Sequence, residues 1–115
     1  MTEDEIKNAI DNNDVVIFMK GSKDFPACGF SAFVVQIFNQ LNVPFKDFDV
    51  MQNPELRQNI KDFSNWPTLP QVYVKGEFIG GCDIIREMHQ SEELQTLLKQ
   101  YSLLPCEATV EKIFV

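Results

Sequence analysis

The sequence contains few cysteines, a single histidine and no long hydrophobic run. Its three cysteines, Cys28, Cys82 and Cys106, are an odd number at wide spacing, which is not the pattern of a disulfide-stabilised secreted protein. The longest apolar run, VVIFM (15–19), is far shorter than the roughly 20 residues that cross a bilayer as a helix. With 10 basic against 17 acidic residues and a formal charge of −7, the chain also lacks a strongly positive composition. We therefore expect neither nucleic acid nor a membrane as a main partner.

The first ten residues, MTEDEIKNAI, contain neither an apolar signal-peptide core nor an arginine-rich presequence. Free cysteines without a secretory segment indicate a reducing compartment. We expect the protein to work in a bacterial cytoplasm, or alternatively in a mitochondrial matrix after removal of a transit peptide.

Apolar patterning predicts one α/β domain. Hydrophobic residues make up 44% of the 115 residues, enough to build a packed core. The runs VVIFMK (15–20) and PFKDFDV (44–50) predict strands, and QVYV (71–74) and EFIG (77–80) flank a hairpin turn at Lys75-Gly76. Helices are expected around them in the order α-β-α-β-α-β-β-α-α. A β-α-β unit followed by a hairpin predicts a small four-stranded mixed sheet with helices on both faces.

Short capping signals mark the expected helix starts. Thr2 and Glu5 have the spacing of a capping box, and Asn53-Pro54 is an N-cap followed by proline at the first helical position. Asp83 is expected to cap the fourth helix, and Ser91 with Glu92 and Glu93 to start the last one.

The second helix is expected over residues 32–41, with one apolar face formed by Phe33, Val34, Ile37, Phe38 and Leu41. The domain is expected to span residues 1–101. Residues 102–115 show no clear periodicity, so they form an extension that is either docked or mobile.

The stretch PACGFS (26–31) places Cys28 at the start of this second helix. Unpaired backbone N–H groups and the helix dipole favour negative charge there, and hence the thiolate form that attacks disulfides and binds metals. Lys20, after the first strand, adds positive charge nearby. The alternative is a buried, inert cysteine, but the flanking Pro, Gly and Ser are uncommon in cores. Ser31 has no thiol to resolve a mixed disulfide, so Cys28 must wait for an external thiol or serve another purpose.

Two further features of the chain leave alternatives open. The Leu69–Pro70 bond precedes a strand, where a cis bond would present a short edge for an extended peptide, although trans bonds are commoner. The turn 80–83 (GGCD) opens a helix whose free N–H groups can take up a carboxylate, or it is a plain strand-to-helix connection.

Taken together, MKG (19–21), CGFS (28–31), WPTLPQVYVKGEFIGGCD (66–83) and the helix that follows closely resemble the monothiol glutaredoxins of the CGFS class. The resemblance covers roughly residues 3 to 100 and is closest to the single-domain bacterial and mitochondrial type. It implies a thioredoxin fold with a cis Leu69–Pro70 bond. It also implies Cys28 as the catalytic thiol and a glutathione groove formed by Lys20, Arg57, Lys61, Leu69, Gly81, Cys82 and Asp83.

The resemblance further implies that the protein carries a [2Fe–2S] cluster. Such a cluster takes about four thiolate ligands, which Cys28, a bound glutathione and a second subunit with its own glutathione would supply. The implied partners are a second copy of the chain, BolA-like proteins and iron–sulfur acceptor apoproteins. Alternatives are a glutathione-dependent oxidoreductase that removes glutathione from proteins through Cys28, and a regulatory adaptor.

Three positions limit what the resemblance implies. The loop GSKDFPA (21–27) departs from the usual family loop. Cys82 is expected to act through its backbone, the alternative being a redox thiol that forms a disulfide with Cys28. Cys106 lies in the extension, and no function is assigned to it.

Overall fold

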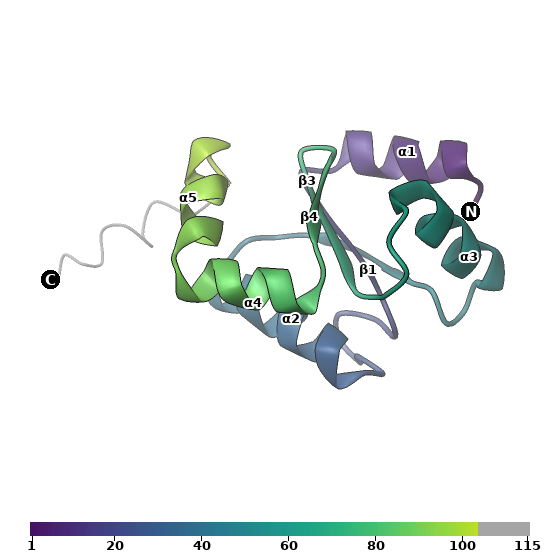
Figure 1. Ribbon diagram of the computed structural model, residues 1–115, viewed down its shortest axis with the longest axis horizontal. Helices are drawn as coiled ribbons and strands as arrows, with labels where there is room; N and C mark the ends of the chain where they lie inside the picture. The colour runs from purple at the N-terminus through teal and green to yellow at the C-terminus, as the bar shows by residue number, and fades with distance from the viewer. Residues whose placement is uncertain (104–115) are drawn as a thin grey trace, which may run out of the picture.

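A four-stranded mixed sheet runs through the middle of the molecule (Figure 1), in a computed structural model that describes residues 1–103. The sheet order is β2-β1-β3-β4. β1 pairs in parallel with β2 and antiparallel with β3, and β4 closes the hairpin with β3. The strands are β1 (Val15–Met19), β2 (Lys46–Asp49), β3 (Gln71–Val74) and β4 (Glu77–Gly80). The predicted mixed sheet is therefore confirmed.

Helices cover both faces of the sheet (Figure 1). On one face lie α1 and α3, and on the other lie α2, α4 and α5. The helices are α1 (Glu3–Asn12), α2 (Gly29–Gln40), α3 (Pro54–Ser64), α4 (Cys82–Gln90) and α5 (Glu93–Gln100). No helix among residues 1–103 has both the length and the apolar character needed to cross a membrane.

The central strand β1 contributes to both halves of the core. Val16 and Phe18 pack with α1 and α3, whereas Val15, Ile17 and Met19 pack with the helices on the other face. All residues of β1 are buried, which explains why its sequence is continuously apolar rather than alternating.

Local signals account for two of the helix starts. Thr2 and Glu5 form the predicted capping box at the start of α1. At α3, the Asn53 side chain accepts a hydrogen bond from the Leu56 N–H at 3.0 Å, and Pro54 is the first helical residue. Both features satisfy backbone groups that a helix end leaves unpaired.

Three predicted helix starts differ from the structure. The second helix begins at Gly29 rather than at residue 32, with Cys28 itself as the N-cap. Gly81, not Asp83, is the N-cap of α4, because β4 turns directly into the helix at Gly80. The N-cap of α5 is Glu92 rather than Ser91.

The predicted buried face of α2 was wrong at one position. Phe33 is 36% exposed, and Val35 is buried in its place. Phe33 lines the hollow beside the Cys28 thiol rather than the core. Most of the predicted extension, with Cys106, lies outside the described residues.

Candidate functional site

Cys28 lies at the N-cap of α2 with an extended backbone (φ −149°, ψ 138°) and a half-buried side chain. Its side chain makes no capping hydrogen bond, so the sulfur remains available to another group. The first backbone N–H groups of α2 lie next to it, where they favour negative charge. Its position and partial exposure leave the sulfur accessible to a ligand, unlike a cysteine packed in the core.

The loop before Cys28 is closed on itself. The Ala27 N–H donates to the Lys20 carbonyl at 2.9 Å, and Gly21 forms a bridge with Pro26. Gly21 has φ +87°, and a Cβ at this position would collide with the backbone N of Ala27. Only glycine can therefore hold this close approach without strain.

Two carboxylates of β2 fasten the same loop to the sheet. Asp49 accepts the Gly21 N–H at 2.9 Å and the Met51 N–H at 2.8 Å. Asp47 accepts the Lys23 N–H at 2.8 Å. The loop that leads into the thiol is thus held by side chains more than twenty positions along the chain.

Ser31, the serine of CGFS, is fully buried. Its hydroxyl accepts the Lys20 N–H at 3.2 Å. This bond joins the first turn of α2 to the residue after β1, and so fixes the thiol relative to Lys20.

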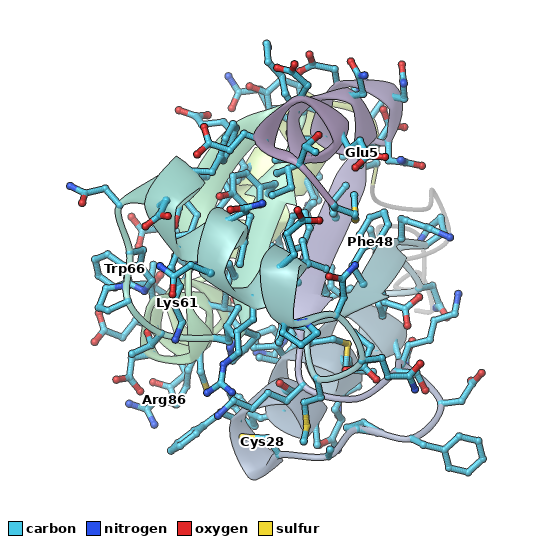
Figure 2. The ribbon with its side chains drawn as sticks, turned by 90° about the vertical axis from the view of Figure 1, so that its right-hand side faces the viewer. Glu5, Cys28, Phe48, Lys61, Trp66 and Arg86 are labelled. Carbon is cyan, nitrogen blue, oxygen red and sulfur yellow. The ribbon has the colours of Figure 1, made fainter. Side chains whose placement is uncertain are left out.

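A cleft of about 440 Å³ opens next to the thiol. Figure 2 shows Lys61 and Trp66 along the side of the molecule above Cys28, with Glu5 at the far end. The cleft is lined by Lys20, Phe30, Arg57, Lys61, Trp66, Pro67, Thr68, Leu69, Gly81, Cys82, Asp83 and Ile84. It therefore contains every residue that the family resemblance assigns to glutathione.

One side of the cleft is cationic. Arg57 and Lys61 are one helical turn apart on α3, and Lys20 enters from the end of β1. Within residues 1–103, none of these three side chains forms an ion pair with a carboxylate. Their charges are available to an anionic ligand, because Arg and Lys provide charge-assisted hydrogen bonds to carboxylates.

The opposite wall is the start of α4. Gly81 is its N-cap, no side chain caps the helix there, and the first-turn residues Cys82 and Asp83 line the cleft. The Asp83 carboxylate, also in the first turn, lies 3.3 Å from the Arg86 guanidinium. This wall presents hydrogen-bond donors and one carboxylate, a combination suited to an amino acid end group with both charges.

Cys82, the first residue of α4, differs chemically from Cys28. Burial raises the pKa of the Cys82 thiol, and the neighbouring Asp83 carboxylate raises it further, against an opposing effect of Arg86. A raised pKa favours the neutral thiol, which is a weak nucleophile and a weak metal ligand. Both thiols are free, and they share a second hollow of about 360 Å³ with Phe30, Phe33 and Arg86.

The third wall, residues 66–69, follows α3 and ends at the cis Leu69–Pro70 bond. Gln71 lies immediately behind this wall and is fully buried. Its amide nitrogen donates to the carbonyls of Trp66 (3.1 Å) and Thr68 (3.2 Å). The Tyr73 hydroxyl donates to its carbonyl oxygen at 3.2 Å.

The sequence-predicted residues do not all share one cavity. Cys28 lines the smaller hollow rather than the larger cleft, and the two are joined through Phe30 and Cys82. The sequence reasoning did not identify Trp66 and Ile84 as lining residues, or Asp49 and Gln71 as supports. Trp66 stands in the quoted motif WPTLP, whereas the two supports act through contacts that no local pattern signals.

Comparisons with known proteins bear on this arrangement. The family model described as glutaredoxin matches residues 15–79. Probable monothiol glutaredoxin 2 of Rickettsia conorii is 57% identical over 97 residues, covering 84% of this chain and 91% of that protein.

Solved structures give the same picture of the fold. A monomeric truncated mutant of Trypanosoma brucei 1-C-Grx1 superimposes with a TM-score of 0.83 at 35% identity, covering 92% of this chain and 96% of that one. A buckwheat glutaredoxin–glutathione complex superimposes with a TM-score of 0.79 at 23% identity, covering 90% of this chain and 92% of that chain. At 23% identity the second likeness speaks for the fold alone.

Proposed function

This chain belongs to the glutaredoxin family, among its monothiol members, and from that premise we propose that it is a glutathione-dependent carrier of a [2Fe–2S] cluster. Its fold is the thioredoxin fold that the sequence predicted. The observation that carries the proposal is the accessible Cys28 sulfur at a helix N-terminus, next to a cleft with a cationic side.

The ligand set follows from the chemistry of the two cysteines. A [2Fe–2S] cluster takes about four thiolate ligands. Cys28 supplies one, whereas the raised pKa of the Cys82 thiol disfavours its metal-binding form. In the proposal, a bound glutathione supplies the second thiolate, and a second subunit with its own glutathione supplies the remaining two. The cluster is cargo, held between two copies of the chain and released because two of its ligands are small, exchangeable molecules.

The charges that line the cleft support glutathione as its ligand. It is an extended tripeptide with a carboxylate at each end and a thiol in the middle. Arg57 and Lys61 would hold one carboxylate, with Lys20 close by, and the start of α4 would hold the γ-glutamyl end at Gly81, Cys82 and Asp83. The middle of the tripeptide would then pass Leu69 and bring its sulfur towards Cys28.

The proposed partners follow from the same role. A carrier must receive its cluster and pass it to apoproteins, and the family resemblance adds BolA-like proteins to these. The proposed setting is a bacterial cytoplasm, or alternatively a mitochondrial matrix, because an exposed thiol and a labile cluster both need a reducing compartment.

Anaerobic reconstitution tests the proposal. The protein is incubated with iron, sulfide and glutathione, and then analysed by visible absorption and gel filtration. We expect a coloured dimer that bleaches and dissociates when glutathione is removed. Cys28→Ser should remove the colour entirely, because it removes the proposed protein ligand and the raised pKa of the Cys82 thiol disfavours a replacement thiolate.

Cys82→Ser is the matched control, since it removes a thiol from the same hollow without removing the proposed ligand. It should retain most of the cluster. Loss of the cluster in Cys82→Ser would contradict the ligand set, and a colourless wild-type monomer would contradict the carrier role.

A second candidate function is favoured by the apolar hollow beside Cys28. In protein deglutathionylation, the Cys28 thiolate attacks the glutathione sulfur of a mixed disulfide and releases the protein thiol. A second glutathione then attacks the Cys28–glutathione disulfide, which regenerates Cys28 and releases oxidised glutathione. Rapid turnover of a glutathionylated peptide by a protein that gains no cluster would favour this enzyme over the carrier.

A further inference from the structure

We propose that Gln71 is a positioning residue that sets the geometry of the ligand-binding wall formed by Trp66, Thr68 and Leu69. This inference rests on the proposed function, because the wall is assigned to glutathione there. Gln71 itself lines neither the cleft nor the hollow beside the thiol. It acts from behind the wall through hydrogen bonds.

Both polar atoms of the Gln71 side chain have hydrogen-bond partners. An amide group offers two N–H donors and a carbonyl acceptor. Its nitrogen lies within hydrogen-bond distance of two wall carbonyls, at Trp66 and Thr68, and its oxygen accepts from the Tyr73 hydroxyl. The bond to Tyr73 is buried and the two bonds to the wall carbonyls are part-buried, so a side chain without an amide leaves these groups with fewer partners.

These bonds replace a regular backbone ladder. Residues 66–69 lie between the end of α3 and β3, and one of them, Pro67, has no backbone N–H to donate. The Trp66 N–H is held from the α3 side, by the Lys61 carbonyl at 3.3 Å and the Ser64 hydroxyl at 3.1 Å. Gln71 holds the carbonyls of Trp66 and Thr68 from the β3 side, so the wall is fixed to both α3 and β3.

The connection reaches the ligand side through Trp66. Its indole nitrogen lies 3.6 Å from where a Cβ on Gly81 would be placed, so the ring lies next to the start of α4. The ring also packs on Phe78, with centroids 5.8 Å apart. A shift of the Trp66 backbone would therefore move the ring and change the shape of the cleft that Trp66 and the start of α4 both line.

Gln71→Met tests the inference, with Tyr73→Phe as the matched control. Methionine has a similar length but no donor, so both wall carbonyls lose their partner. Phenylalanine at position 73 removes the bond to the other end of Gln71 and leaves both donors on the wall. The measurements are glutathione affinity by calorimetry, the emission and acrylamide quenching of Trp66, which is the single tryptophan, and the melting temperature.

We expect Gln71→Met to weaken glutathione binding about tenfold, in line with the loss of two part-buried hydrogen bonds, and to change Trp66 emission. Tyr73→Phe should bind glutathione within about twofold of wild type even if its melting temperature falls. Equal affinity in wild type and Gln71→Met would overturn the inference. So would equal losses in both variants, because the effect would then follow stability alone.

Two further arms keep the outcomes distinct. If Gln71→Met does not fold, Gln71→Asn retains the amide one methylene short of the carbonyls and should show the same direction of change. If wild type itself binds no glutathione, the proposed function fails. Trp66 emission and quenching then still decide the positioning role, because they need no ligand.

Discussion

Tyr73 is a single side chain whose surroundings change its acid–base chemistry. It is 2% exposed and packs edge-on against Phe18, with ring centroids 5.7 Å apart. Burial raises the pKa of the Tyr73 hydroxyl to about 12, and a hydrogen bond with Ser64 opposes the rise. Since the neutral hydroxyl also donates to Gln71, the folded state keeps its proton well above the range in which an unfolded tyrosine ionises.

The sign of the stability effect follows from this raised pKa. An unfolded tyrosine loses its proton near pH 10, roughly two pH units before the folded one. The contribution of Tyr73 to stability is therefore complete below about pH 10 and is lost as the pH rises towards 12. We expect urea unfolding to show a smaller alkaline loss of stability in Tyr73→Phe than in wild type. Tyr101→Phe, at a site 37% exposed, should keep the wild-type loss, and identical curves for all three proteins would contradict the assignment.

Strand β2 shows how one element supports another. Its sequence KDFD places Asp47 and Asp49 on the same face of the strand. Each carboxylate accepts a hydrogen bond from a backbone N–H group of the loop before Cys28. Asp49 binds the buried Gly21 and also the Met51 N–H, whereas Asp47 binds the exposed Lys23. The two carboxylates are thus chemically alike, but Asp49 accepts two backbone hydrogen bonds and Asp47 accepts one.

Alanine substitutions should separate the two. Asp49→Ala leaves a buried N–H without its acceptor and should reduce the free energy of unfolding by about 1–3 kcal/mol. Asp47→Ala leaves the exposed Lys23 N–H free to bond to water, so it should reduce the free energy of unfolding by less than about 0.5 kcal/mol. Chemical denaturation measures both. Equal losses of unfolding free energy in the two variants would contradict the expectation that the loop depends more on Asp49 than on Asp47.

The same elements show how far sequence alone could go. The mixed sheet, the capping box and the Asn53–Pro54 start of α3 follow from local periodicity and capping, and the structure confirms them. The residues expected to bind glutathione were named by the family resemblance, and in the structure they line one cleft. Their roles in binding stay a prediction. Asp49 and Gln71 could not be found this way, because their partners are set by tertiary packing. The structure starts α2 at Gly29, three residues before the expected start at residue 32, and the glycine and serine there are weaker helix formers than alanine.

For the whole molecule, the distribution of charge matters more than its sum. The chain has a formal charge of −7, yet the cleft collects three cations without ion-pair partners among residues 1–103. Elsewhere in the described chain, Lys75 is paired with Asp14 at 2.8 Å, at the end of β3 away from the cleft. An anionic peptide should therefore be attracted to one place on a generally repulsive surface.

A pair of charge-matched variants tests this point. Arg57→Gln and Lys75→Gln each remove one positive charge, but only the first removes it from the cleft. We expect Arg57→Gln to weaken glutathione binding about tenfold or more, since hydrogen bonds to charged groups contribute about 1.5–3 kcal/mol. Lys75→Gln should remain within about twofold. Titrations by calorimetry at low and high salt would show the difference, and equal losses would mean that only net charge matters.

The order of the sheet also has a consequence for self-association. Both edge strands, β2 and β4, are only four residues long, and β2 carries charge at three of its four positions. Short, charged margins of this kind resist lateral addition of a further strand, which is the usual route to fibrils. Two copies are therefore steered away from pairing through their sheet edges, and in the proposed dimer they would meet at the surface that bears Cys28 instead.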